Sequence, residues 1–161
     1  MKTNYSFFAF VLIVVLFGCS RYQPPKTYNV IKEMTYDKSF DDIWNTAIEW
    51  FATQGTPVKN MDKTSGFIST EYSLSTGQMN CLDCGVAGQA LLAVQRLEDP
   101  RGNFNLLIKK QPDGKTKVTV NCFFKATSNV YYEGRITSSN VIDCVSTGSL
   151  EKQILDYLGN H

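Results

Sequence analysis

Hydrophobic residues recur at helical spacing in one stretch of the chain. The apolar positions of this stripe are Phe40, Ile43, Trp44, Ala47, Ile48 and Phe51. Ser39 is a favourable N-cap residue, and Gly55 followed by Pro57 is typical of a helix end. The pattern therefore predicts an amphipathic helix over residues 40–54 that packs on another layer. Trp50 lies off the stripe, which makes it a candidate for exposure.

Apolar and polar residues alternate along two segments that follow this helix, as they do in half-buried strands. One hairpin is expected over residues 56–74, with Gly66 in its turn. A second is expected over residues 103–126, with its turn at residues 112–114. Further strands are predicted over residues 27–37, 89–97 and 141–145. The middle one of these also fits a short helix, but we favour a strand.

Three segments complete the pattern. Residues 75–88 are rich in small and polar residues and are predicted to form a loop, and residues 127–140 a polar connection with two exposed tyrosines. A last helix is expected over residues 146–159, with an inward face made by Leu150, Ile154, Leu155 and Leu158. The element order is β-α-β-β, further strands and a final α. It predicts an α+β fold, with a mainly antiparallel sheet and two helices on one face.

The N-terminus has a charged start and a short apolar run. Lys2 precedes an uninterrupted apolar segment from Phe7 to Phe17. This run is too short to cross a bilayer, which takes roughly 20 residues. It therefore fits a secretory signal peptide better than an uncleaved anchor with an incidental cysteine.

The sequence "LFGCS" resembles the lipobox of bacterial lipoproteins, with Leu16, Gly18 and Cys19 in the characteristic positions. The resemblance implies that residues 1–18 are removed and that the Cys19 thiol and amino group carry fatty acyl chains such as palmitate. Stable anchoring takes more than one fatty acyl chain, and a cysteine acylated at both groups meets this condition. Such a cysteine attaches the protein to a membrane. In such lipoproteins of diderm bacteria, an aspartate directly after the lipidated cysteine resembles an inner-membrane retention signal. This chain has Ser20 at that position. We therefore expect the outer membrane, with the domain facing the periplasm.

Removal of the signal peptide leaves 143 of the 161 residues, enough for one domain with a single core. Residues 19–27 contain two prolines and are predicted to form an extended tether, so the domain spans residues 28–161. Without Lys2 the chain has 15 basic and 15 acidic residues. That balance provides no basic surface for nucleic acid or for anionic lipid headgroups.

Four more cysteines follow, and they are Cys81, Cys84, Cys122 and Cys144. In an exported protein this even number favours two disulfides, in any of three pairings. One pairing joins Cys81 to Cys84 and Cys122 to Cys144. The "CLDC" spacing also suits zinc, but no second pair of that kind is present. The "CLDC" segment follows a polar loop and not a strand, which argues against a thioredoxin-like redox pair. Gly85 stands where haem attachment needs a histidine. We therefore expect no metal and no cofactor.

The sequence contains no recognisable catalytic constellation. Its one histidine, His161, is the final residue, and chain ends usually fray. Asp41 and Asp42 are adjacent on a helix and do not face each other, and a position in the first turn suits both. Motifs for phosphate binding, nucleophilic hydrolysis and zinc proteolysis are missing. We therefore expect a non-enzyme. The alternative is an anchored hydrolase, which would need a cluster of polar side chains that only folding assembles.

Residues 36–70 resemble small bacterial lipoprotein domains, including the repeated domains of BamC from the outer-membrane β-barrel assembly machinery. The shared pattern is a strand, a helix that opens Phe-Asp-x-x-Trp, a bend and a "DKTSGFI" turn. Residues 144–155 are also similar to the closing helix of such lipoproteins. The resemblance covers about half of the mature chain and implies a helix-grip-like fold. It also implies that Cys84 pairs with Cys144, while Cys81 and Cys122 pair with each other or stay free.

Two functional hypotheses follow. The first is a non-catalytic binding or scaffolding module, anchored in the outer membrane, whose partners are envelope proteins. The second is a lipid-anchored carrier or receptor for a small apolar ligand held between sheet and helix. A concave pocket with convergent polar groups would favour the carrier, and a filled interior would favour the binding module.

Overall fold

The computed structural model describes residues 21–70, 72–73, 80–90 and 92–161. The predicted lipidation site, Cys19, lies outside these residues. In chain order the elements are β1 (Glu33–Tyr36), α2 (Phe40–Gln54), β2 (Val58–Asp62), β3 (Phe67–Thr70), β4 (Tyr72–Ser73), β5 (Leu82–Asp83), β6 (Ala93–Lys110), β7 (Thr116–Tyr132), β8 (Arg135–Ser146) and α3 (Ser149–Asn160). Their order confirms the predicted α+β class.

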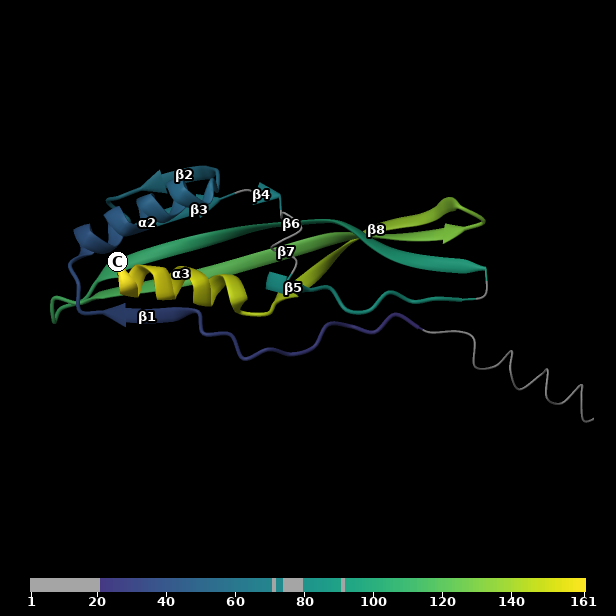
Figure 1. Cartoon of the computed structure of the whole chain (residues 1–161), viewed down its shortest axis with the longest axis horizontal. Coiled ribbons are helices and arrows are strands. Elements are labelled where there is room, and N and C mark those ends of the chain that lie inside the picture. Colours follow the sequence, from purple (N-terminus) through teal and green to yellow (C-terminus); the bar gives the residue numbers. More distant parts are fainter. Residues whose placement is uncertain (1–20, 71, 74–79, 91) are drawn as a thin grey trace, which may run out of the picture.

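The strands in the described part of the chain form one open sheet with the order β2-β3-β6-β7-β8-β5 (Figure 1). Two short strands lie off this path, because β1 pairs with the first residues of β7 and β4 pairs with β6. The pairings are antiparallel. The mainly antiparallel sheet predicted from the sequence is therefore confirmed.

Two long strands form the spine of the molecule. β6 has 18 residues and β7 has 17, and they pair from Lys110–Thr116 beside their turn to Ala93–Tyr132 at the far end. The molecule is elongated as a result (Figure 1). Both helices lie over the half of the sheet near the β6–β7 turn. The other half is a ribbon of β6, β7 and β8 that extends beyond the helices.

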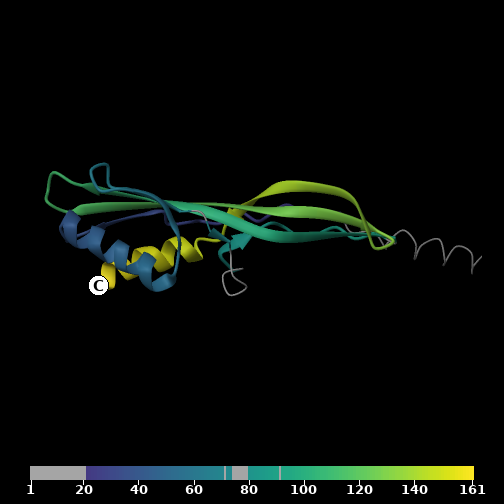
Figure 2. The ribbon, with the colours of Figure 1, turned by 90° about the horizontal axis from the view of Figure 1, so that it is seen from above.

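Both helices cover the same face of the sheet (Figure 2). The space between helices and sheet is filled by side chains with almost no solvent exposure, and the apolar ones are Ile43, Ile68, Phe104, Leu106, Ile108, Val118, Val120, Leu150, Ile154, Leu155 and Leu158. On β6 and β7 these residues alternate with more exposed ones, as the period of a strand requires. The inward face predicted for the last helix is confirmed.

Helix α2 has the predicted bounds and caps. The Ser39 hydroxyl accepts a hydrogen bond from the Asp42 backbone N–H, and Gly55 ends the helix with a φ of 61°. Trp50 is not exposed, however. Only 3% of it is accessible, and its ring meets Phe104 edge-on at 5.8 Å. Because α2 packs against α3 as well as the sheet, more of its circumference is covered than the single stripe indicates.

The prediction of a polar connection over residues 127–140 is wrong. β7 continues to Tyr132 and β8 begins at Arg135, so this segment is a hairpin. Its two turn residues, Glu133 and Gly134, have positive φ values of 49° and 78°, the geometry of a tight two-residue turn. These polar residues belong to the sheet because β7 pairs with both β6 and β8, and not because the segment is rich in apolar residues.

Among the other predicted strands, those of the two hairpins are confirmed and two more have different bounds. The two hairpins are confirmed, with Gly66 and Gly114 in their turns at φ values of 71° and 85°. Of the strand predicted over residues 89–97, only residues 93–97 belong to a strand, and they begin the much longer β6. The strand predicted over residues 27–37 is shorter, since only β1 is paired with a neighbouring strand. Neither α2 nor α3, the helices of the described residues, has the length and apolar character needed to cross a bilayer.

Candidate functional site

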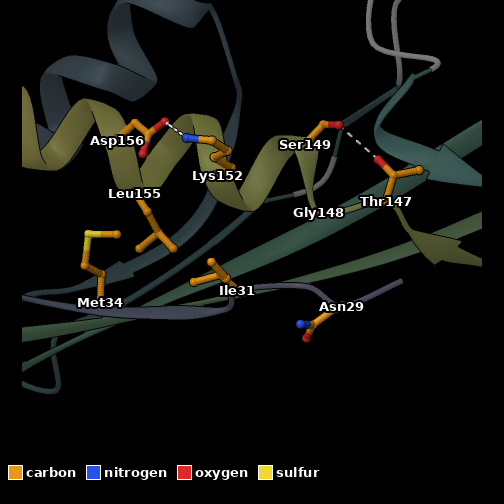
Figure 3. Close-up of a pocket in the computed structure, with 9 residues that line it drawn as sticks. All are labelled: Asn29, Ile31, Met34, Thr147, Gly148, Ser149, Lys152, Leu155 and Asp156. Carbon is orange, nitrogen blue, oxygen red and sulfur yellow. Dashed lines mark hydrogen bonds and ion pairs between the residues drawn. The ribbon is translucent and has the colours of Figure 1, made fainter. Parts of the chain in front are cut away.

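A surface groove lies between two walls, which are β1 with the extended chain before it and α3 with the two residues before it (Figure 3). Its volume is about 290 Å³. The lining residues are Asn29, Ile31, Met34, Thr147, Gly148, Ser149, Lys152, Leu155 and Asp156. We call this site the β1–α3 groove. Its two walls are far apart in the sequence, so only the fold creates it.

The centre of the β1–α3 groove is apolar. Ile31 and Met34 project from one wall towards Leu155 on the other (Figure 3). Ile31 is 64% exposed and Met34 is 38% exposed, although both are apolar. Adjacent exposed apolar side chains beside a recess, with a polar rim, are typical of an interaction site.

Polar pairs flank this apolar centre. At one end Lys152 forms an ion pair with Asp156, one helical turn further along α3. At the other end the hydroxyl oxygens of Thr147 and Ser149 are 3.1 Å apart. The groove thus combines an apolar centre with hydrogen-bonding groups at both ends. This arrangement suits a short peptide segment with one or two apolar side chains.

The walls of the groove are tied together by hydrogen bonds. The Tyr36 hydroxyl donates to the Leu155 carbonyl at 2.7 Å, and the Lys38 ammonium donates to the Gly159 carbonyl at 2.9 Å. Burial, with a smaller contribution from the charge of Asp156, raises the pKa of Tyr36. The hydroxyl therefore remains a donor at physiological pH. These contacts fix β1 against α3 without any bound partner.

The chain before β1 is held against the loop around β5. Gln23 and Val86 exchange two backbone hydrogen bonds of 3.0 and 2.9 Å, and the Tyr22 hydroxyl donates to the Cys84 carbonyl at 2.9 Å. The sequence analysis placed these N-terminal residues in the tether over residues 19–27. In the structure, the part of that tether from residue 21 onwards lies on the domain.

Asp83 organises this contact. Its carboxylate accepts hydrogen bonds from the backbone N–H groups of Gly85 at 2.7 Å and Lys26 at 3.1 Å, and from the Tyr28 hydroxyl at 2.8 Å. The two backbone donors, first that of Gly85, hold the pKa of Asp83 below its usual value. Asp83 thus stays ionised and sets the path of the chain towards the groove.

A disulfide joins Cys84 to Cys144, 60 residues later in the chain. The two residues lie directly across from each other, just beyond the β5–β8 pairing, and their Cα atoms are 4.3 Å apart. The pairing implied by the lipoprotein resemblance is therefore confirmed. The bridge holds the loop on which the N-terminal chain docks.

The expectation of two disulfides is wrong, because Cys81 and Cys122 are free. Cys81 precedes β5 and Cys122 lies on β7, and β8 runs between these two strands in the sheet. Burial, followed by the charge of Glu151, raises the pKa of both thiols. Because the thiolate is the reactive form, neither cysteine has the character of a nucleophile.

The other residues singled out from the sequence do not come together. His161 is exposed at the end of α3, with its ring stacked on Tyr157 at 4.1 Å. Asp41 forms an exposed ion pair with Lys63 at 2.8 Å. Within the described ranges no group of three histidine, cysteine or acidic side chains is arranged to hold a metal.

Sequence reasoning missed the β1–α3 groove. Ile31 and Met34 gave only a weak signal, since apolar residues are expected in the strand predicted over residues 27–37. Their partner wall is α3, and nothing local connects the two segments. Comparison with protein-family models and with curated proteins found no match to this chain.

Proposed function

We propose that the protein is a non-catalytic binding module of the bacterial cell envelope, anchored in the outer membrane through Cys19. Its β1–α3 groove binds an apolar segment of an envelope protein. The observation that carries this proposal is the pair of exposed apolar residues, Ile31 and Met34, beside a groove with polar ends. The groove lies next to the chain that leads back to the anchor.

The filled interior supports a protein partner over a small apolar ligand. Side chains with almost no exposure, such as Phe104 and Ile43, occupy the space between sheet and helices where a carrier would hold its ligand. The groove is instead open at the surface and, at about 290 Å³, takes only a few side chains. Lipid-anchored transport of a small molecule is therefore the alternative function that the binding experiment must test.

Replacement of Ile31 by aspartate should weaken partner binding about tenfold or more. A charge in the apolar centre removes burial of an isoleucine, worth roughly 1.5–3 kcal/mol, and adds a desolvation cost. The measurement is affinity capture from cell envelopes with tagged full-length protein, followed by titration of the recovered partner. Stability should stay unchanged because Ile31 is 64% exposed.

Met61→Asp is the matched control, since Met61 is an exposed apolar residue on β2, outside the groove. It should capture the same partner as the unaltered protein. If Ile31→Asp captures that partner equally well, the groove is not the binding site. Recovery of a small apolar molecule in place of a protein would support the carrier.

Replacement of Cys19 by alanine should abolish the anchor. The variant should accumulate as an unprocessed precursor and incorporate no labelled palmitate, because the thiol is the acyl acceptor in the lipobox interpretation. Gel mobility and palmitate labelling check this result. Continued cleavage after residue 18 together with continued labelling would contradict the lipoprotein assignment.

A further inference from the structure

Exposed apolar side chains gather at the end of the β6–β7–β8 ribbon that lies away from the helices (Figure 1). Val94 on β6 lies opposite Tyr131 on β7, which lies opposite Ile136 on β8. Leu92 directly precedes β6, whose first residue pairs with Tyr132. Leu92 is 60% exposed and Ile136 is 54% exposed. We call this end of the sheet the ribbon tip, and it comprises residues 88–90, 92–94 and 131–136.

The apolar side chains of the ribbon tip project from both faces of the sheet. Val94 and Ile136 share one face with Tyr131, because directly opposite residues in antiparallel strands point the same way. Tyr132 follows Tyr131 in β7 and therefore points to the other face, where it is also exposed. A protein that docks on a sheet covers one of its faces. A lipid surface that receives the tip end-on covers both, so this arrangement favours lipid.

The chain that leads back to Cys19 runs towards this tip. Gln23 and Val86 form an antiparallel bridge. From Val86 the chain continues to Gly88, whose carbonyl accepts a hydrogen bond from the Gln95 backbone N–H near the start of β6. Because the bridge is antiparallel, the chain from Gln23 back to residue 21 runs in the same direction as the chain from Val86 to Gly88. Both segments therefore head for the ribbon tip.

The chain between the predicted lipidation site and the tip is short. Figure 1 shows that the described chain begins beside the ribbon, away from the helices. Cys19 is four residues before Gln23, so the chain between them spans at most about 14 Å. Acyl chains on Cys19 would therefore hold the ribbon tip close to the bilayer surface.

We propose that the ribbon tip contacts the surface of the membrane that holds Cys19, with Leu92 and Ile136 among the lipid headgroups and the first part of the acyl chains. This inference rests on the Cys19 anchor of the proposed function. At that surface the exposed apolar side chains are removed from water, which favours the contact. Tyr132 suits the same position, since its ring is apolar and its hydroxyl is polar.

Charged residues at the tip limit the depth of the contact. Glu133 and Arg135 are exposed at the β7–β8 turn. Because a charged side chain is costly in hydrocarbon, the tip stays at the level of the headgroups. Without Lys2 the chain has 15 basic and 15 acidic residues, so no net charge draws the domain to anionic lipid. The contact should therefore form on uncharged lipid and change little with salt.

Contact at the ribbon tip orients the domain on the membrane. Both helices, and with them the β1–α3 groove, lie over the other half of the sheet (Figure 1). A tip held at the bilayer therefore directs the groove away from the membrane, towards partners in the periplasm.

Tyr132→Trp tests the contact by exchanging one aromatic residue of the tip for another. The acylated full-length variant is placed in vesicles of phosphatidylcholine that is brominated near the headgroup end of its acyl chains. The added tryptophan should lose fluorescence through contact with bromine. Met61→Trp, at an exposed position on β2 in the other half of the sheet, is the matched control and should lose none. Trp44 and Trp50 are buried and give the same background in both variants.

A second pair of variants tests the side chains that make the contact. Leu92→Asp with Ile136→Asp, added to Tyr132→Trp, should restore the fluorescence, because two carboxylates oppose entry into the interface. Both replaced residues are exposed, so the melting temperature should not change. Met61→Asp in the same Tyr132→Trp background should leave the quenching intact.

Palmitate labelling of the same preparation separates this inference from the anchor. A labelled protein in which Tyr132→Trp is not quenched, or in which Met61→Trp is quenched equally, would overturn the tip contact and leave the anchor standing. Quenching that survives the two aspartates would refute the assignment to Leu92 and Ile136. Absence of the label would overturn the anchor and, with it, the tip contact.

Discussion

Ile43→Asp is expected to destabilise the domain by about 3–5 kcal/mol. Ile43 lies in the first half of α2 with no solvent exposure, packed within the core between helix and sheet. An aspartate there loses the burial of the isoleucine and places a carboxylate within the cluster of buried apolar side chains. For a domain of this size the melting temperature should fall by roughly 10–20 °C, which circular dichroism measures directly.

Asn45→Asp is the matched control on the same helix. Asn45 is exposed, so the same carboxylate should change stability by less than about 0.5 kcal/mol. Equal melting temperatures for the two variants would contradict the face assignment of α2. If Ile43→Asp does not fold, Ile43→Val gives a graded measurement with an expected loss of about 1 kcal/mol.

Loss of the Cys84–Cys144 disulfide should cost about 4 kcal/mol in the loop-entropy model, because the bridge closes a loop across 60 residues. The variant with serine at both positions should therefore melt well below the unaltered domain. It should also release the loop around Asp83 on which the N-terminal chain docks. Thermal unfolding with and without a reductant measures the first effect, and amide hydrogen exchange of residues 21–28 measures the second.

The reductant supplies the control for this experiment. It should lower the melting temperature of the unaltered protein but leave that of the double serine variant unchanged, since the free Cys81 and Cys122 are not part of a bridge. Non-reducing peptide mapping should recover a fragment that joins Cys84 to Cys144. A fragment with Cys81 bonded to Cys84 would contradict the structure.

The docking contacts, the disulfide and the groove form one continuous arrangement. The chain runs from the predicted anchor over the loop held by Cys84 and Asp83, and then along α3 into β1. The groove therefore includes the chain that leads back to Cys19, the predicted lipidation site. A partner bound there would contact both the tether and the domain.

Local sequence determined the features that depend on a few neighbouring residues. The bounds of α2 follow from a cap at Ser39, a helical apolar stripe and a glycine at residue 55. The hairpin turns at Gly66 and Gly114 follow from the positive φ that glycine adopts easily. Alternation along β3 and β7 indicated that one face of each strand is buried. The α+β class followed from the order of these elements.

Only the tertiary structure decided the features that join distant segments. Residues 127–140 carry no apolar pattern, and they form a hairpin because β6 and β7 extend a ladder into which β8 can pair. Trp50 is buried because α2 is covered on more than one side. The β1–α3 groove and the pairing of Cys84 with Cys144 depend on which segments the fold brings together. The apolar pattern of one helix or strand indicates which of its residues are buried. It does not indicate which other element covers them, because contacts between elements depend on packing between residues far apart in the sequence.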